Sequence, residues 1–177
     1  MNKQRDMQMV RILEVAKENP RIKTIYLDVA MKAEPGEFIM AWIPGVNEKP
    51  FSLSYCDGSK IGISIAAIGP FSTALHQAAP GGMLGIRGPF GNGFKPAGEK
   101  VVVVGGGCGT APLTYLVEQL AKSGKKAFFI IGAKTKSELL FVQRAKSAGA
   151  EVIVCTDDGS EGRKGLATDA LADLLSN

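Results

Sequence analysis

The sequence predicts two domains, a small antiparallel β-barrel followed by a partial, doubly wound parallel α/β domain. In residues 9–94, short apolar segments of strand length are separated by turn residues, which is typical of small barrels. After residues 95–98, strands alternate with helices, and this alternation specifies a parallel sheet with right-handed crossovers. We therefore expect one domain in residues 1–96 and a second, incomplete at its C-terminal end, in residues 97–177.

The first domain contains several short segments with the composition of strands, of which five examples follow, separated by turn residues such as Asn-Pro, Pro-Gly and Asp-Gly. These segments are residues 9–18, 22–30, 37–43, 51–56 and 61–68. The alternation of polar and apolar residues in 22–29 is imperfect, so at least one strand is expected to be buried on both faces. A short helix is expected to interrupt the barrel, capped by Ser72 and stopped by the Pro-Gly-Gly of residues 80–82.

The second domain is expected to contain three strands and three helices. The strands are residues 100–104, 127–131 and 151–155, and the helices are residues 112–123, 137–148 and about 166–175. Four consecutive valines predict that the first strand is buried on both faces. This strand is central in the doubly wound order, but with only three strand–helix units it becomes an edge strand.

Composition excludes several classes of protein. Glycine accounts for 22 of 177 residues without a Gly-X-Y period, which excludes collagen and indicates many tight turns or ligand loops. The longest apolar runs are too short to cross a membrane, and the N-terminal residues lack the apolar core of a signal peptide, so we expect a cytoplasmic protein with no membrane partner. The net charge is +4, but the cations are scattered, so no nucleic-acid partner is expected.

The cysteines and the single histidine carry little chemistry. Cys56, Cys108 and Cys155 are about fifty residues apart and form no Cys-x-x-Cys pair, which argues against a disulfide framework, a zinc site or an iron–sulfur cluster in this chain. We expect all three to be small apolar residues of the core and assign no metal site. His76 lies in the short predicted helix and is expected to be structural rather than catalytic.

The most specific motif is Gly-Gly-Gly-Cys-Gly-Thr-Ala-Pro at residues 105–112, between the valine strand and a helix. Glycines let the backbone approach a pyrophosphate, and the first amides of the helix face the anion. Pro112 suits the first helical turn, where an amide hydrogen would have no partner. The spacing is not Gly-x-Gly-x-x-Gly, and no Gly-Lys-Ser/Thr follows, so a P-loop kinase or GTPase is disfavoured. The alternative is a tight strand–helix turn with no ligand.

Four further motifs lie in loops or at strand ends. Lys-Pro-Phe-Ser at residues 49–52 could contact a phosphate and a ring, although Phe51 could equally be core and Lys49 a solvated charge. The glycine loop at residues 69–75 could hold a phosphate. In residues 88–94, Asn92-Gly93 favours a tight turn that displays two phenylalanines. Residues 156–160, Thr-Asp-Asp-Gly-Ser, follow the third strand of the parallel sheet, at the edge where ligands bind, although Asp and Gly are also ordinary loop residues.

The order of these five motifs resembles the ferredoxin-NADP reductase superfamily over nearly the whole chain. Within it, the chain is most similar to the electron-transfer subunits of dihydroorotate dehydrogenase. The resemblance implies an FAD-binding barrel and an NAD-binding domain, in an oxidoreductase that passes electrons between NAD(H) and a catalytic dihydroorotate dehydrogenase subunit in pyrimidine biosynthesis. Another reductase of this fold, serving ferredoxin or sulfur compounds, and a non-catalytic nucleotide-binding module stay open, as does a homodimer.

The resemblance also implies roles for individual residues. Lys49 would meet the FAD phosphates, Phe51 would flank the isoalloxazine, and Ser52 would reach the flavin N5 region as the catalytic contact, with no general base. The other implied FAD-binding residues are Pro50, Ile65, Ala66, Gly69, Phe71, Ser72 and Thr73. The implied NAD-binding residues are Gly105, Gly107, Gly109, Thr110, Ala111, Pro112, Asp157, Asp158, Gly159 and Ser160.

The chain departs from the family pattern at four places. Lys49 replaces an arginine, which gives a point charge where a bidentate fork is usual. Ala66 stands where related subunits often carry arginine, and Phe71 replaces a loop glycine. FAD is favoured over FMN. Family members continue with a Cys-Gly-Pro strand and, in the dihydroorotate subunit, a segment that holds a 2Fe–2S cluster; this chain stops at Asn177 with neither. We therefore expect a shortened form of a longer subunit, with any cluster outside it.

The choice between NAD and NADP rests on the resemblance, which favours NAD. Lys134 and Lys136 follow the second strand of the α/β domain, where a cation could receive a 2′-phosphate. They could equally belong to a solvated loop.

Overall fold

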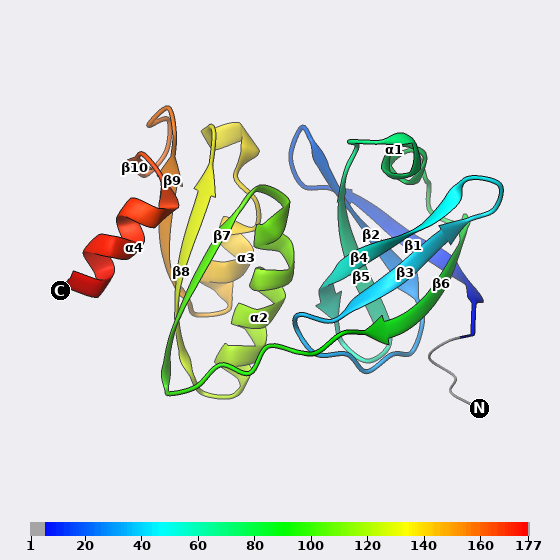
Figure 1. Cartoon of the computed structure of the whole chain (residues 1–177), viewed down its shortest axis with the longest axis horizontal. Coiled ribbons are helices and arrows are strands. Elements are labelled where there is room, and N and C mark those ends of the chain that lie inside the picture. The colour runs from blue at the N-terminus through cyan, green and yellow to red at the C-terminus, as the bar shows by residue number, and fades with distance from the viewer. Residues whose placement is uncertain (1–5, 177) are drawn as a thin grey trace. The chain divides into compact units, whose positions relative to one another are not determined.

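The chain folds into a β-barrel unit, residues 1–94, and an α/β unit, residues 95–177 (Figure 1). The structure is a computed structural model that describes residues 6–176. A closed antiparallel barrel followed by a parallel sheet with helices is the predicted fold class, which is confirmed.

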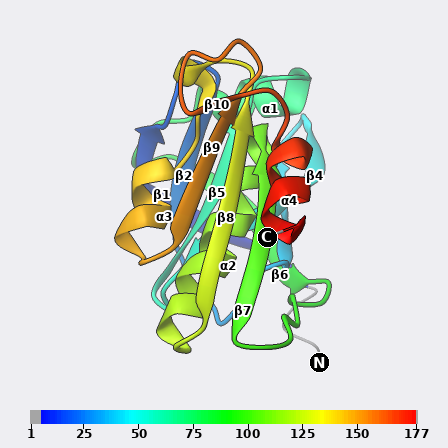
Figure 2. The ribbon, with the colours of Figure 1, turned by 90° about the vertical axis from the view of Figure 1, so that its left-hand side faces the viewer.

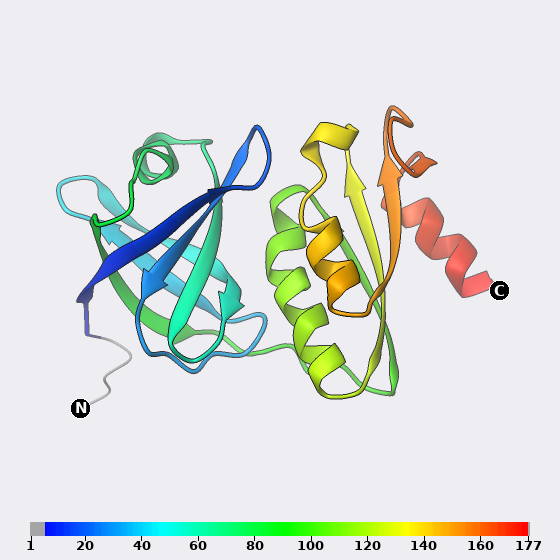
Figure 3. The same ribbon diagram turned by 180° about the vertical axis from the view of Figure 1, so that it is seen from behind.

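Six strands close the barrel in the order β1-β2-β5-β4-β3-β6 (Figures 1 and 3). They are β1 (Gln8–Lys17), β2 (Ile22–Asp28), β3 (Phe38–Ile43), β4 (Asn47–Cys56), β5 (Lys60–Ala66) and β6 (Met83–Phe90). Their inward residues are mostly isoleucine and leucine, and Ile25, Leu27 and Ile39 are fully buried. Closure pairs every strand on both sides, so the barrel has no open edge.

Helix α1 (Pro70–His76) begins earlier than predicted, because Gly69, not Ser72, is its N-cap residue. Ser72 is the third helical residue, and its hydroxyl accepts hydrogen bonds from the amides of Ile68, at 3.0 Å, and Gly69, at 2.9 Å. The prediction was wrong because a serine at this position can reach back to the cap, which stabilises the helix start from inside the first turn.

The tight turn predicted at Asn92-Gly93 is also absent from the structure. The residues of this segment with positive φ are Gly88, at 138°, and Gly91, at 86°. The chain then runs past the turn at residues 34–36, where the amide of Phe94 donates to the carbonyl of Pro35 at 2.8 Å. Packing against this neighbouring turn, rather than local turn preference, therefore decides the conformation.

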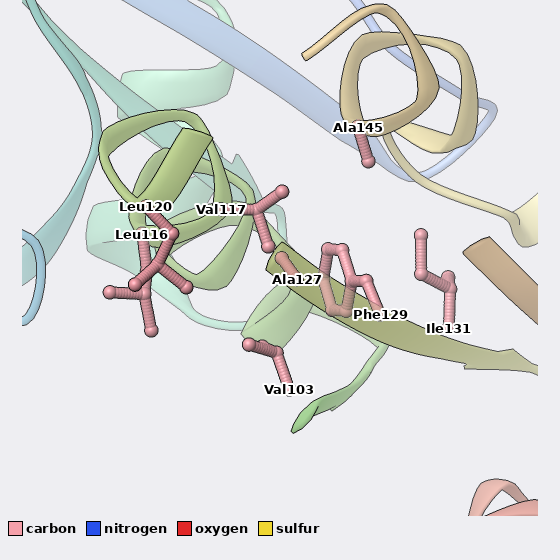
Figure 4. Packing of buried hydrophobic residues seen from close by; sticks show 8 residues of the cluster. All are labelled: Val103, Leu116, Val117, Leu120, Ala127, Phe129, Ile131 and Ala145. Carbon is pink, nitrogen blue, oxygen red and sulfur yellow. The ribbon is translucent and has the colours of Figure 1, made fainter. Parts of the chain in front are cut away.

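The α/β unit contains a parallel sheet with the strand order β10-β9-β8-β7 (Figure 2). The strands are β7 (Lys100–Gly106), β8 (Lys126–Ala133), β9 (Glu151–Thr156) and β10 (Arg163–Lys164), of which β10 was not predicted. Helices α2 (Thr110–Lys122) and α3 (Val142–Ser147) cover one face, and α4 (Ala167–Ser176) covers the other. Phe129 and Val117 are at the centre of the core between β8 and α2 (Figure 4).

The helix predicted for residues 137–148 is broken. A short 3₁₀ helix, η3 (Lys136–Glu138), is followed by extended residues, and α3 starts only after Phe141, which has φ of 58°. Leu140 is 1% exposed, so the extended segment places an apolar side chain in the core that a continuous helix would direct elsewhere. Core packing therefore overrides the helical pattern.

Strand β7 lies at the edge of the sheet, as predicted, but it is not buried on both faces. Val103 is 5% exposed, whereas Val102 is 37% exposed. Cysteine burial also differs from the prediction, because Cys56 and Cys155 are buried but Cys108 is exposed. In residues 6–176, no helix is long and apolar enough to span a membrane.

Gly162 is the glycine whose replacement we expect to disturb the α/β unit most. Its φ is +65°, and an added Cβ would overlap the carbonyl oxygen of Val154. Gly149 has φ of +89° with no atom within 4 Å of such a Cβ, so it controls for backbone strain alone. Gly149→Ala should lower the free energy of unfolding by about 1–2 kcal/mol, and Gly162→Ala by roughly 1–3 kcal/mol more. Urea denaturation followed by helical circular dichroism measures both, and equal losses would contradict the clash.

Candidate functional site

Strand β4 presents the Lys-Pro-Phe-Ser segment at the side of the barrel. Lys49 pairs with Ala41 and Phe51 with Ile39 on β3, while Ser52, on the other face of the strand, pairs with Phe38. Lys49 and Ser52 are exposed, and within residues 6–176 neither side chain has a hydrogen-bond or ionic partner. The segment therefore offers an exposed cation on the same face of the strand as the half-buried ring of Phe51, and an exposed hydroxyl on the other face.

The ring of Phe51 is stacked on that of Phe71, with the centroids 5.9 Å apart and the planes at 29°. Phe71 belongs to α1 and is 5% exposed, so it is a core residue rather than a surface contact. The structure thus brings together two predicted residues that lie twenty positions apart in the sequence. Sequence reasoning assigned each to the flavin separately and did not predict their contact.

The remaining residues predicted around the flavin differ in accessibility. Ile65 is 1% exposed, so its side chain belongs to the core of the barrel. Pro50 and Thr73 are exposed, and Ala66 is half-buried. Because the Ser72 hydroxyl already bonds the amides of Ile68 and Gly69, these three groups are engaged at the helix start.

The glycine loop follows β7 and leads through a 3₁₀ turn, η2 (Gly107–Gly109), into α2. A Cβ at Gly105 would lie 2.9 Å from Leu113 Cδ1 and 3.2 Å from Thr110 Cα, so this glycine lets the helix pack on the strand. Cβ atoms at Gly107 and Gly109 would have no atom within 4 Å. Only these last two leave open space next to the backbone.

The first residues of α2 offer backbone groups rather than side chains. Thr110 and Ala111 are 0% and 2% exposed, and Pro112, which lacks an amide hydrogen, is half-buried. Among the described atoms, Thr110 Oγ1 is buried with no hydrogen-bond partner. The exposed side chain of the loop is Cys108, which the sequence analysis had assigned to the core.

Residues 157–160 lie at the same edge of the sheet as the glycine loop. Gly106 pairs with Gly132 and Ala133 with Thr156, so the carboxyl ends of β7, β8 and β9 are adjacent (Figure 2). The amide of Asp157 donates to the carbonyl of Ala133 at 3.1 Å. The parallel sheet therefore gathers the predicted nucleotide-binding residues of this unit at the carboxyl ends of its strands.

Within that loop, Asp158 and Ser160 already bind each other. The Ser160 hydroxyl donates to Asp158 Oδ1 at 2.6 Å, and the Ser160 amide donates to the same oxygen at 2.9 Å. These bonds stabilise the carboxylate and hold the pKa of Asp158 below its ordinary value. The amide of Lys136 donates to Ser160 Oγ at 2.7 Å, which ties the loops after β8 and β9 together.

An ion pair missed by sequence reasoning reinforces this connection. Lys136 Nζ lies 2.9 Å from a carboxylate oxygen of Glu161, and this contact is the main cause that lowers the pKa of Glu161. Spacing gave no signal for it, because the pair depends on the path of the loop after β9. Within residues 6–176, no group of His, Cys, Asp or Glu side chains could hold a metal ion.

The most informative comparison is with curated proteins. Three relatives, from Methanocaldococcus jannaschii, Pyrococcus horikoshii and Archaeoglobus fulgidus, are each named "Probable dihydroorotate dehydrogenase B (NAD(+)), electron transfer subunit". They are 42%, 44% and 34% identical to this chain over 93%, 90% and 93% of its length. The alignments cover 62%, 60% and 67% of the relatives. The chain belongs to this family of electron transfer subunits.

The chain spans about three fifths of the length of these subunits, and no family model matches it. Solved structures support the fold. An NADH-dependent reduced ferredoxin-NADP oxidoreductase is 24% identical, with a TM-score of 0.85 over 95% of this chain and 63% of that one. The flavohem-like FAD/NAD-binding domain of nitric oxide dioxygenase from Vibrio cholerae is 21% identical, with a TM-score of 0.81 over 92% and 80%. At this identity, the likeness concerns the fold alone.

The Asp158 loop gives a prediction about pH. Removing the hydroxyl in Ser160→Ala should raise the pKa of Asp158, and only part of the way because the backbone amide still donates. A carboxylate with a lowered pKa stabilises the fold above its unfolded pKa of about 4 and loses this effect as the pH falls. The variant should therefore lose less stability in acid than the parent.

NMR titration of the Asp158 carboxyl measures the shift. Ser137→Ala is the control, because the Ser137 hydroxyl bonds Thr135, at 2.9 Å, in the neighbouring loop. The assignment fails if the two variants change the titration of Asp158 equally.

Proposed function

We propose that this chain is the flavin- and nicotinamide-binding part of an electron transfer subunit, which passes electrons between NAD(H) and a catalytic subunit acting on dihydroorotate. The observation that carries the proposal is the 42% identity, over 93% of the chain, to the M. jannaschii protein named as such a subunit. We assign the flavin to residues 1–96 and the nicotinamide to residues 97–177, and we place the reaction in the cytoplasm.

The side chains of β4 fit the FAD that we propose for the barrel. Lys49 would attract the phosphates, Phe51 would pack against the isoalloxazine, and Ser52 would hydrogen-bond near N5. The fit rests on the exposure of Lys49 and Ser52 and on the absence of competing partners for them within residues 6–176. When bound, FAD supplies hydride acceptance and electron transfer, and the protein supplies position and electrostatics.

The glycine loop fits the pyrophosphate of NAD(H). The empty space beside Gly107 and Gly109 allows a phosphate to approach the backbone closely, and the first amides of α2 favour an anion. Asp157 is exposed and could contact the nicotinamide ribose. The engagement of Asp158 and Ser160 with each other gives these two residues the role of shaping the loop.

The residues described here do not fit the 2Fe–2S cluster that the family resemblance implies. Such a cluster needs four clustered ligands, usually cysteines. Cys56 and Cys155 are buried in different units, Cys108 is exposed, and no metal-binding group of side chains is present in residues 6–176.

The mechanism needs no general base from this chain. Hydride transfer depends on the distance and orientation of the two rings, so the protein's work is to bind and orient them. Ser52 would donate a hydrogen bond where negative charge develops on the flavin, and Lys49 would balance the phosphates. Both groups act without changing protonation state.

The absorption spectrum of the purified chain tests the proposal. We expect a flavin band that bleaches when NADH is added without oxygen, and electrons that then reach the dihydroorotate subunit when it is present. A protein that binds nucleotide but never flavin would contradict the proposal.

Lys49 and Ser52 should affect different steps. Lys49→Ala should weaken FAD binding roughly two- to fivefold, as for an exposed ion pair, whereas Lys49→Arg should retain or tighten it. Ser52→Ala should leave FAD bound but slow its reduction by NADH about tenfold or more, because an oriented donor is lost. FAD titration and stopped-flow reduction measure the two effects. If both variants changed the same quantity, the two roles would not be separate.

Gly109→Val should strongly weaken nicotinamide binding without unfolding the chain. Gly109 has no positive φ, and its Cβ position is open, so the side chain has room in the fold but blocks the backbone from a phosphate. NADH affinity should fall at least about tenfold, since one hydrogen bond to a charged group contributes roughly 1.5 kcal/mol or more. Gly109→Ala should lose less, and flavin content should stay constant in both. Parent-like NADH titration of the valine variant would show that the loop is only a turn.

A further inference from the structure

Phe71 is held in place by contacts at both ends of α1. It follows Gly69-Pro70, and the Ser72 hydroxyl fixes the helix start through the amides of Ile68 and Gly69. Leu75, one turn later on the same face of α1, is 1% exposed. At the other end of the helix, Lys23 Nζ donates to the carbonyl of His76 at 2.8 Å, which ties α1 to β2. Phe71 is thus anchored from both sides.

Phe51 is held through its backbone, which pairs with Ile39 on β3, while its side chain is only half-buried. It lies on β4, where its ring is half-buried and stacks on Phe71 with a centroid distance of 5.9 Å and an interplanar angle of 29°. Aromatic rings prefer this offset stacked arrangement, so the fixed ring of Phe71 selects one orientation for Phe51. The accessible part of Phe51 is then presented in a defined plane.

A planar ligand binds more tightly to an aromatic ring whose orientation is already fixed. If the ring of Phe51 could rotate, binding would have to order it, and this ordering would weaken the complex. Orientation also decides how well two rings align for hydride transfer.

We propose that Phe71 is a positioning residue for the isoalloxazine, which it orients indirectly by fixing the ring plane of Phe51. This inference rests on the proposed function, because it assumes flavin next to Phe51. Phe71 itself, at 5% exposure, is too buried to form the face of the flavin site. Its role is therefore to hold the ring of Phe51 in place and not to contact the flavin itself.

The test compares variants that remove the supporting ring with variants that keep it. Phe71→Leu and Phe71→Met keep apolar bulk without an aromatic face, and Phe71→Tyr keeps the ring. Leu75→Met is the matched control, since it perturbs the same buried face of α1 one turn after Phe71 and is not among the residues proposed to contact the flavin. The measurements are FAD affinity, circular dichroism of the bound flavin in the visible region, and the melting temperature.

We expect Phe71→Leu and Phe71→Met to weaken FAD binding roughly three- to tenfold, the range that aromatic pair energies imply, and to change the visible circular dichroism. Phe71→Tyr should restore both signals. Leu75→Met should lower the melting temperature while the flavin signals stay those of the parent.

Two results would overturn the inference alone. In the first, the parent binds FAD, and Phe71→Leu and Phe71→Met bind it with the same affinity and spectrum. In the second, Leu75→Met alters the flavin signals as much as these two variants do. A parent that binds no flavin would overturn the proposed function and this inference together. In that case NMR of the Phe51 ring in the parent and in Phe71→Leu would still show whether the two rings are coupled.

Discussion

Closure of the barrel is the constraint on which the proposed flavin site depends. Strand β4 is paired with β3 along residues 47–52 and with β5 along residues 53–56, so the ladder to β3 fixes the positions of Lys49, Phe51 and Ser52. Rigid elements hold side chains more precisely than loops do. The same closure fixes β4 and β5, the strands that α1 contacts, and α1 in turn places Phe71. The backbone pairing of the barrel therefore determines, through α1, where the ring of Phe71 lies.

The glycines of the α/β unit show why a motif cannot be interpreted one residue at a time. Gly105 is required by the packing of α2 on β7, Gly162 by a left-handed backbone against Val154, and in the loop after β7 Gly107 and Gly109 have open space beside the backbone. All four are identical in the sequence. Their roles separate only when the neighbours in space are known, and these neighbours come from other strands and helices.

The sequence predicted what depends on local pattern and missed what depends on packing. The barrel, the parallel sheet, the strand at its edge and the positions of the motifs followed from turn residues, apolar runs and the order of elements. The prediction of a continuous helix over residues 137–148 was wrong, because the segment that buries Leu140 is extended. The prediction that Val102 is buried was wrong, because the burial of an edge strand depends on which elements cover it. The stack of Phe51 on Phe71 joins two motifs whose distance in space no spacing rule gives.

The candidate site residues divide according to whether their polar groups already have partners. Ser72, Asp158 and Ser160 were predicted to bind cofactors, and each is already hydrogen-bonded within its own loop, so a ligand would bind beside these bonds or compete with them. A ligand that binds Lys49 or Ser52 would displace no side-chain hydrogen bond or ion pair of these two residues within residues 6–176. Recognition of the flavin should therefore rest on few side chains, with one lysine and one serine supplying polar contacts and the paired rings supplying shape. In a site with so few polar contacts, the orientation of an aromatic wall contributes a larger share of the specificity than it would in a site rich in arginines.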